Sequence, residues 1–216
     1  MESLKEKSKR AEKIVEILKK LKGMPYLSVH KKDSPFRILI GTILSQRNRD
    51  IMTEKASKKL FSKFDNVEKM ANASLKEIEK LIKQSGFYKT KAKYIKKTSR
   101  IILEKYNGKV PKDMDKLLEL PGVGRKTANC VLVYAYRKDA IPVDTHVHRI
   151  SNRLKLVNTK KPEETEKELL KIVPKKYWQV FNELLVNHGQ TVCKPIKPEC
   201  YNCKIVDYCK FKNKNL

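Results

Sequence analysis

Apolar residues recur at helical spacing along almost the whole chain, and no segment of any length alternates as a half-buried strand does. Near the N-terminus, an apolar stripe at helical spacing has lysines on the opposite face, and it comprises Ile14, Val15, Ile17, Leu18 and Leu21. The pair Ser34-Pro35 predicts an N-cap followed by proline at the first helical position. The same periodicity predicts further helices near residues 50–63, 75–84, 88–105, 112–120, 124–137, 145–155, 162–173 and 175–190. We therefore expect an all-α fold built from short helices.

The charge balance indicates a polyanionic partner. The 216 residues include 50 Lys and Arg against 24 Asp and Glu, which gives a formal net charge of +26. So large an excess repels itself in the folded state, and binding to nucleic acid explains it better than stability does. A thermophile-like surface would match its lysines with glutamates, and here they are not matched.

The sequence predicts no association with a membrane. No apolar run approaches the roughly 20 residues that a bilayer-spanning helix needs. The first residues carry alternating charge and lack the apolar segment of a secretory signal. We expect a soluble, intracellular protein.

The segment Leu120–Ala128, with the sequence LPGVGRKTA, predicts a hairpin between two helices. Its paired glycines tolerate a positive φ and allow a ligand to approach the backbone closely. The helix that follows offers unpaired N–H groups and a positive dipole end, and both favour a phosphate. A nucleic-acid backbone is therefore expected on this hairpin, and its contact residues are predicted to be Gly122, Val123, Gly124 and Arg125.

Lys126 stands two residues after the second glycine, beside the expected phosphate. A lysine is protonated at neutral pH, so it becomes a nucleophile only where its charged form is disfavoured. A helix N-terminus, the adjacent Arg125 and desolvation by bound substrate all act in that direction. The spacing alone is equally compatible with a lysine that only contacts phosphate.

Asp144, in the segment Val143-Asp144-Thr145-His146, is the candidate partner of this lysine. A helix over residues 124–137 rises roughly 20 Å, and an extended return over residues 138–143 covers about the same distance. Asp144 is also predicted to be the N-cap of the next helix. Capping does not exclude a carboxylate that accepts a proton or stabilises positive charge on a sugar.

Four cysteines close to the C-terminus predict a metal centre. They are separated by six, two and five residues, and they are Cys193, Cys200, Cys203 and Cys209. Clustered thiols in a reducing compartment favour a metal over disulfides. Structural zinc sites usually have shorter spacers, whereas four thiolates also suit a [4Fe–4S] cluster, so the spacing favours iron and sulfur modestly. Cys130 stands apart and is expected to be a small buried residue.

Together these motifs resemble those of the endonuclease III family of DNA glycosylases. The resemblance rests on the hairpin, on the VDTH segment and on the C-x6-C-x2-C-x5-C tail, and it extends over roughly residues 34–209. It implies a six-helix barrel domain over residues 28–138, with the helix–hairpin–helix at about 112–137. It also implies a second helical domain that carries the [4Fe–4S] cluster and is formed by residues 1–27 and 139–216. A damaged nucleotide would bind in the cleft between the two domains.

The resemblance further implies an enzyme of base excision repair. Lys126 would attack C1′ of an extruded damaged nucleotide, typically an oxidised pyrimidine, and displace the base. The resulting Schiff base would lead to β-elimination and strand cleavage on the 3′ side, which is AP lyase activity. Asp144 matches the essential aspartate of the family. The expected partner is double-stranded DNA with damaged bases or abasic sites, bound by a cytoplasmic, nucleoid-associated monomer.

Two positions are expected to enter the DNA duplex. Phe87 sits where family members carry a wedge residue, although a core aromatic at a helix junction fits the sequence equally well. The family commonly has Ser-x-Gln-x-x-Asp after its first barrel helix, whereas residues 45–50 read SQRNRD. The glutamine is displaced by one position, so either Gln46 or Arg47 fills the gap opposite the orphan base. Base preference stays open.

The loop between Cys193 and Cys200 is expected to contact DNA phosphates. It has the sequence KPIKPE, in which two prolines restrict the backbone and Lys194 and Lys197 supply positive charge. The metal centre would then have a structural role, because it closes this loop.

Two alternatives compete with a bifunctional enzyme. A monofunctional glycosylase of the same superfamily, acting on uracil or thymine mismatches, would need few substitutions in the pocket. The adenine-removing branch usually has another residue at the position of Lys126, which argues against that branch. A non-enzymatic helix–hairpin–helix DNA-binding module with a structural metal is the second alternative, and the joint presence of Lys126 and Asp144 argues against it.

Overall fold

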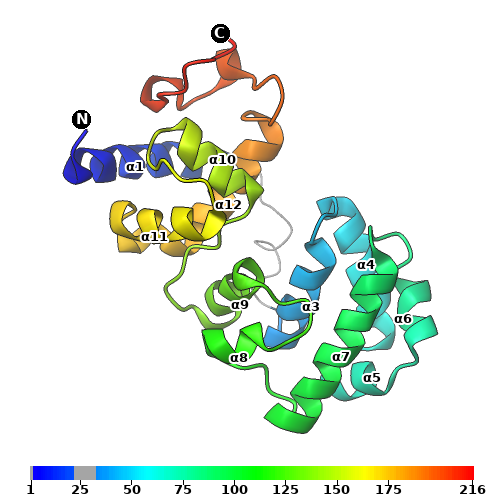
Figure 1. The fold of residues 1–216 in the computed structure, drawn as a ribbon. Helices are drawn as coiled ribbons and strands as arrows, with labels where there is room; N and C mark the ends of the chain where they lie inside the picture. Colours follow the sequence, from blue (N-terminus) through cyan, green and yellow to red (C-terminus); the bar gives the residue numbers. More distant parts are fainter. Residues whose placement is uncertain (1, 22–32) are drawn as a thin grey trace. The chain divides into compact units, whose positions relative to one another are not determined.

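The computed structural model describes residues 2–21 and 33–216, and within these ranges the regular structure is helical, without strands (Figure 1). The all-α prediction is confirmed. The chain divides into two compact units. The internal unit comprises Tyr26–Arg137, and the terminal unit combines Met1–Pro25 with Lys138–Leu216.

The internal unit is organised around α3, which is buried on nearly all sides. Its helices are α3 (Pro35–Ser45), α4 (Asp50–Lys63), α5 (Val67–Asn72), α6 (Leu75–Leu81), α7 (Tyr88–Tyr106), α8 (Met114–Leu118) and α9 (Arg125–Tyr136). Ser34 caps α3 by accepting from the Arg37 amide, and Pro35 occupies the first turn as predicted. Because Phe36 and every residue over 38–44 are buried, α3 packs against α4, α7 and α9.

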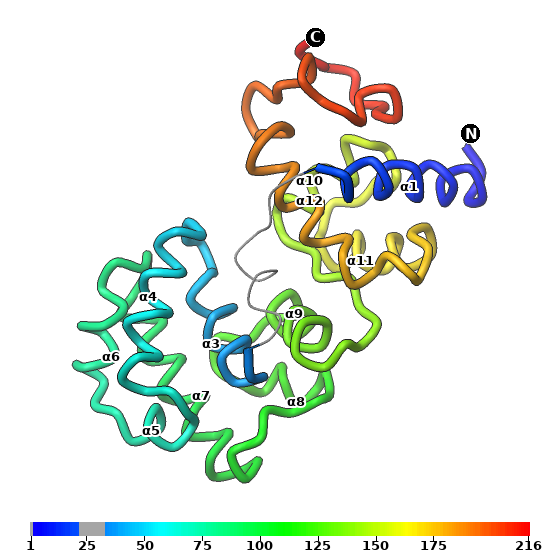
Figure 2. The backbone as a smooth tube through the Cα atoms, turned by 180° about the vertical axis from the view of Figure 1, so that it is seen from behind, coloured from blue at the N-terminus to red at the C-terminus, as the bar shows by residue number. Residues whose placement is uncertain are grey.

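The terminal unit joins both ends of the chain in one core. Its helices are α1 (Leu4–Lys19), α10 (Thr145–Arg153), α11 (Pro162–Ile172) and α12 (Trp178–Thr191), with the short helices η1 (Lys175–Tyr177), η2 (Cys200–Asn202) and η3 (Val206–Tyr208). Ile14, Val15 and Leu18 of the predicted stripe are buried, and α1 packs on α11 and α12. Leu21 lies beyond the end of α1 and is exposed, so that part of the prediction was wrong. Figures 1 and 2 both show α1 close to the C-terminal segment.

Several predicted helix limits were wrong. The helix expected over 112–120 is confined to α8, which starts after the N-cap Asp113 and ends at Leu118, shortly before Pro121 and Gly122. The helix expected from residue 175 begins as η1, and α12 starts only at Trp178. The sequence reasoning missed α5, whose six residues are too few to show a helical period, although Asn66 caps it. The expected domain boundary after residue 27 falls among residues 22–32 and lies outside the described residues.

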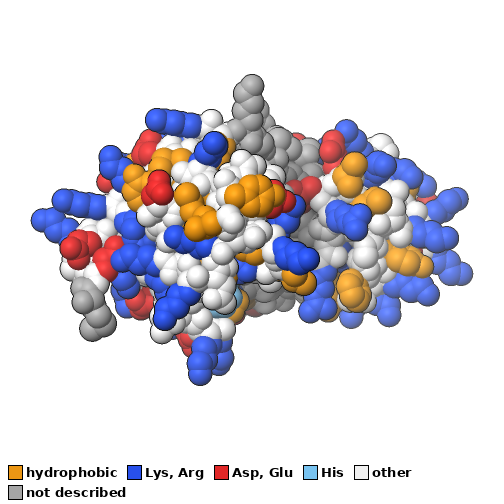
Figure 3. Space-filling view, turned by 90° about the horizontal axis from the view of Figure 1, so that it is seen from above, with side chains coloured by type: hydrophobic (Ala, Val, Ile, Leu, Met, Phe, Trp, Pro, Cys, Tyr) orange, Lys and Arg blue, Asp and Glu red, His pale blue; other side chains and the backbone are white. Residues whose placement is uncertain are grey.

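Positive charge is widespread on the surface. Lys and Arg prevail among the charged side chains on the face seen in Figure 3. In the part of the chain that the structure describes, no helix is both long enough and apolar enough to cross a bilayer.

Candidate functional site

The turn between α8 and α9 is built around Gly122. Its φ is +78°, and a Cβ at this position would lie 2.7 Å from Cδ2 of Tyr94, so a side chain is excluded by both conformation and space. The Thr98 hydroxyl donates to the Pro121 carbonyl at 2.8 Å. The backbone of the turn is thereby fixed against α7.

At the start of α9, the backbone is open to a ligand. Gly124 is the N-cap, and a Cβ added there would meet nothing within 4 Å. Glycine offers no side-chain acceptor to the first-turn amides, which is the arrangement found at phosphate-binding helix ends. Lys126 lies half-buried in this first turn, whereas the side chain of Val123 is buried in the core. The Val123 amide donates to the Leu120 carbonyl at 3.0 Å, so both the side chain and the N–H of Val123 are engaged within the fold.

The structure distinguishes Gln46 from Arg47. The half-buried Gln46 amide donates to the Gly122 carbonyl at 2.8 Å and to Oγ1 of Thr127 at 3.2 Å. Gln46 thereby connects the hairpin turn to the start of α9 and stabilises both. Arg47 is exposed and has a φ of 48°. Its guanidinium carbon lies 5.8 Å from the centre of the Phe87 ring. Gln46 is thus engaged inside the fold, and Arg47 is not.

Phe87 is no core aromatic. Its side chain is 62 % exposed, and it occupies the N-cap position of α7 with a φ of 58°. An L residue rarely adopts this left-handed conformation unless the surroundings impose it. The structure therefore brings two exposed predicted DNA-contact residues, Arg47 and Phe87, together in the internal unit.

Lys91 was missed by sequence reasoning. It lies on the buried face of α7 and is only 3 % exposed. Burial lowers the pKa of Lys91 to about 8. The helical phase could have revealed it, because Lys91 shares the buried stripe of Ile95 and Ile102.

In the terminal unit, Asp144 caps α10 as predicted. Its Oδ1 accepts from the Val147 amide at 2.8 Å. The preceding Ile141–Val143 segment is buried, and the Asn182 side chain donates to the Pro142 carbonyl at 2.8 Å. The half-buried carboxylate is therefore held between a fixed extended segment and a helix.

The four clustered cysteines line one hollow of the terminal unit. None forms a disulfide, and together they border one hollow that is partly open to solvent. His188 also borders it, with Nε2 at 3.7 Å from Sγ of Cys203. Burial raises the pKa of the Cys203 thiol to about 11. Cys130 lies elsewhere, fully buried in α9, as expected.

No group of three or more His, Cys, Asp or Glu among the described residues could hold a single metal ion. A [4Fe–4S] cluster would make a different demand on the four cysteines, because each thiolate would bind a separate iron and not one shared ion. Four unpaired thiols around one hollow fit that donor set.

Two arginines of α10 support the cysteine segment, and sequence reasoning missed both. Arg153 donates to the Lys194 and Pro195 carbonyls, each at 2.7 Å, and lies 3.4 Å from Sγ of Cys193. Arg149 donates to the Cys193 carbonyl at 2.8 Å. These contacts place positive charge beside a thiol that a metal centre requires as thiolate.

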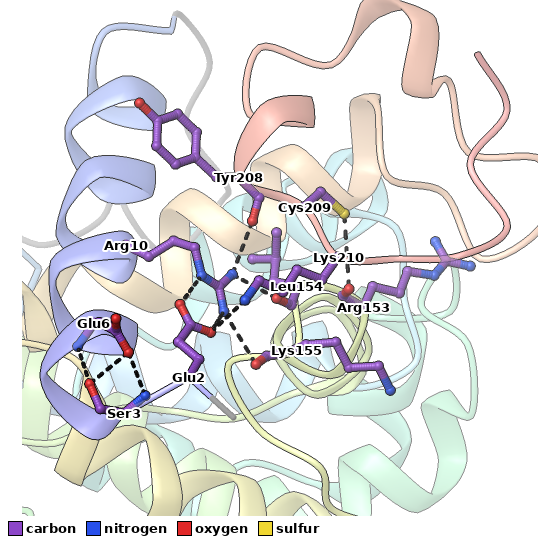
Figure 4. A network of polar contacts seen from close by, with 10 residues as sticks. All are labelled: Glu2, Ser3, Glu6, Arg10, Arg153, Leu154, Lys155, Tyr208, Cys209 and Lys210. Atoms are coloured by element: carbon purple, nitrogen blue, oxygen red, sulfur yellow. Dashed lines mark hydrogen bonds and ion pairs between the residues drawn. The ribbon is translucent and has the colours of Figure 1, made fainter.

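A third arginine reaches the same segment from α1 (Figure 4). Arg10 donates to the Leu154 carbonyl at 2.7 Å and to the Tyr208 carbonyl at 3.0 Å. It also forms a two-pronged ion pair with Glu2, with both distances at 2.8 Å. The pairing with Arg10 lowers the pKa of Glu2 to about 2. The N-terminal helix is thereby tied to the residue that precedes Cys209.

The two lysines of the loop between Cys193 and Cys200 differ. Lys194 forms an ion pair with Glu199 of the same loop, which offsets its charge. Lys197 is exposed at a positive φ of 50°.

Comparison with known proteins identifies relatives over most of the chain. Residues 40–175 match the HhH-GPD superfamily of base excision DNA repair proteins. Endonuclease III of Thermotoga maritima is 51 % identical over 182 residues, covering 84 % of this chain and 85 % of that protein. A solved non-covalent endonuclease III–DNA complex has a TM-score of 0.87 at 35 % identity and covers 97 % of this chain and 96 % of that chain. A trapped endonuclease III–DNA covalent intermediate has a TM-score of 0.85 at 33 % identity and covers 97 % of both chains.

Proposed function

Since this chain belongs to the HhH-GPD superfamily of base excision DNA repair proteins, we propose that Lys126 and Asp144 carry its chemistry. The chain is a DNA glycosylase with AP lyase activity, as its sequence similarity to endonuclease III proteins indicates. Its substrate is proposed to be a damaged, typically oxidised, pyrimidine in double-stranded DNA. The single observation that carries the proposal is the position of Lys126 in the first turn of α9, directly after a hairpin whose backbone is open.

The proposed reaction begins with the neutral amine of Lys126. It attacks C1′, the bond from C1′ to the base breaks, and the base leaves with that electron pair and takes up a proton. Opening of the sugar ring gives an imine between C1′ and Nζ. Loss of a C2′ proton then breaks the C3′–O bond, and water hydrolyses the imine to free the lysine. The positive end of α9 favours the uncharged amine that the first step needs.

Asp144 is proposed to supply negative charge in the same reaction. A carboxylate can accept the proton that the amine loses, or stabilise positive charge that develops on the sugar ring. The capping bond from Val147 supports this role, because it fixes the orientation of the carboxylate without removing its charge.

For the DNA contacts, we propose that Arg47 and Phe87 enter the duplex while Gln46 stays within the protein. The bonds from Gln46 to the Gly122 carbonyl and Thr127 support this assignment, as does the exposure of the other two side chains. The backbone of Gly122, Gly124 and Arg125 is proposed to bind phosphates, while the Val123 amide stays bonded to the Leu120 carbonyl. In the cysteine loop, Lys197 is the better phosphate ligand, because Lys194 is paired with Glu199.

The four clustered cysteines are proposed to hold a [4Fe–4S] cluster of structural function. The cluster would cross-link the C-terminal segment, and Arg149 and Arg153 would stabilise the loop around Cys193. The assignment of residues 28–138 to a barrel domain and of residues 1–27 and 139–216 to a cluster domain belongs to the same proposal. So do a monomeric state and association with the nucleoid.

Reduction with borohydride tests the role of Lys126. Duplexes that carry thymine glycol, uracil or an abasic site are incubated with enzyme and borohydride, which converts an imine to a stable covalent adduct. We expect an adduct with the wild type and none with Lys126→Ala, while Lys109→Ala, an exposed lysine of the same unit, retains it. Base release without any adduct would show a monofunctional enzyme, and an adduct that persists in Lys126→Ala would place the nucleophile elsewhere.

A further inference from the structure

A buried lysine links two turns of the internal unit. Nζ of Lys91 donates to the Leu44 carbonyl at the end of α3, at 2.8 Å, and to the Ser85 hydroxyl at 3.0 Å. The Asn48 amide donates to the same hydroxyl at 3.2 Å and to Oγ1 of Thr53 at 3.2 Å. The turn after α3 and the turn before α7 are thus joined through the Lys91 ammonium group and through the direct bond from Asn48 to Ser85.

Each joined turn ends in an exposed, left-handed residue. Arg47 follows Leu44 by three positions, and Phe87 follows Ser85 by two, and both have positive φ values. The guanidinium of Arg47 and the ring of Phe87 lie 5.8 Å apart. Neither conformation is favourable for an L residue in isolation, so the underlying hydrogen bonds must hold the pair in place.

Stability alone does not account for a lysine at this position. The two acceptors that the structure gives it, a carbonyl and a hydroxyl, carry no formal charge to offset that of the ammonium. Burial accordingly lowers the pKa of Lys91 to about 8. An apolar side chain of similar length would fill the space without desolvating a charge. A polar group kept at such a cost commonly specifies a geometry that function needs.

We propose that Lys91 is a positioning residue that locks the two turns together, so that Arg47 and Phe87 enter the DNA duplex as one rigid pair. This inference rests on the proposed function, in which these two side chains occupy the space that the extruded nucleotide leaves. Lys91 itself contacts neither DNA nor the reacting atoms. It acts by removing the cost of ordering two strained turns at the moment of binding.

Two substrates separate positioning from chemistry. Excision from a lesion-bearing duplex requires the nucleotide to be extruded, whereas an abasic site in a single strand has no stack to leave. Lys91→Met keeps the chain length and removes the hydrogen bonds. We expect it to slow single-turnover excision from the duplex by roughly tenfold to a hundredfold, the range that small misplacements produce. Borohydride trapping on the single-stranded abasic oligonucleotide should change by less than about twofold.

Matched variants control the measurement. Lys93→Met removes an exposed charge from the same helix and should leave duplex excision close to wild type. Ser85→Ala removes the hydroxyl that accepts from both Lys91 and Asn48, and it should also slow the duplex reaction. Because the bond between Lys91 and Ser85 is lost in both variants, their effects should be less than additive in the double variant. Circular dichroism at the assay temperature verifies that each variant is folded.

The outcomes distinguish the inference from the function on which it rests. If Lys91→Met slowed the reactions on the lesion duplex and on the single-stranded abasic oligonucleotide equally, the positioning role of Lys91 would be overturned. Additive effects on the rate in the double variant of Lys91 and Ser85 would overturn it too. A wild type that forms no adduct with an abasic site in either a duplex or a single strand would instead overturn the proposed lysine chemistry. Unchanged duplex excision in a folded Lys91→Met variant would also refute the inference.

Discussion

Asp144 combines a structural and a proposed chemical task in one side chain. Its Oδ1 closes the first turn of α10 through Val147, and this bond orients the whole carboxylate. Asparagine caps helices about as well as aspartate, because its side-chain oxygen accepts the same hydrogen bond. Substitution can therefore remove the charge and leave the cap.

Asp144→Asn should slow base removal more than it slows cleavage of a preformed abasic site. The negative charge is proposed to act where positive charge develops on the sugar, which is the glycosylase step. Single-turnover rates on a lesion duplex and on an abasic duplex provide the measurement. Asp144→Ala is the contrasting variant, since it should also lose about 0.5–2 kcal/mol of stability with the cap. Equal losses of both activities in Asp144→Asn would contradict the assigned role.

Among the helices, α1 supports the cysteine segment through Arg10 as well as packing its apolar stripe into the core. The stripe packs into the core of the terminal unit, while Arg10 on another part of the helix reaches the carbonyls of Leu154 and Tyr208. The Arg10 and Glu2 side chains are only 10 % and 15 % exposed, so their pairing is weakly screened by water. The helix thus braces the end of α10 and the last segment before Cys209.

Arg10→Met should loosen the cysteine segment. It leaves the carbonyls of Leu154, Lys155 and Tyr208 and the Glu2 carboxylate without this partner, which should cost about 2–4 kcal/mol of stability. We expect iron, measured by elemental analysis, to be released faster to a chelator than from wild type or from Lys9→Met, an exposed control on the same helix. Stoichiometric zinc in the wild type would contradict the proposed cluster, and unchanged iron release in Arg10→Met would contradict the bracing role.

The ion pair between Arg10 and Glu2 also makes the folding stability depend on pH in a defined direction. Because the pKa of Glu2 is lowered from 4.5 to about 2, the stabilisation of the folded state by the ionised Glu2 carboxylate is fully present at neutral pH. That contribution is lost as the pH falls from about 4.5 towards 2. The difference in stability between wild type and Arg10→Met should therefore narrow over this acidic range.

The molecule as a whole carries a large excess of positive charge. A net charge of +26 is spread over both units, and lysines and arginines stand out on the face in Figure 3. Only those side chains that neutralise phosphates release counterions and make binding depend on salt. The rest raise the rate of encounter with DNA.

Affinity for undamaged duplex should fall more than tenfold when salt rises about fourfold, as expected when roughly two or more phosphates are neutralised. Fluorescence anisotropy over a salt series measures the slope. Replacement of Lys197 by Ala should reduce this slope, whereas replacement of the paired Lys194 should change it less. Affinity that does not vary with salt would contradict binding through phosphates.

Much of this protein could be predicted from local patterns. The helical period predicted the all-α class, the capping roles of Ser34 and Asp144 followed from residue type, and the hairpin followed from its paired glycines. These features depend on residues within a few positions of each other, so their physical causes are visible in the order of amino acids. The cysteine spacing and the resemblance it carried belong to the same class of information.

Other features depend on segments that lie far apart in the chain. The residues near Gln46 do not indicate its hydrogen bond to the Gly122 carbonyl. Those near Lys91 do not indicate its hydrogen bond to the Leu44 carbonyl. The contact of Arg10 with Tyr208 spans almost the entire sequence. Which polar groups become buried, and with which partners, follows from the packing of distant helices, because desolvation and hydrogen bonding are settled by neighbours in space. Residue order alone therefore left Gln46 and Arg47 equivalent, and the fold separated them.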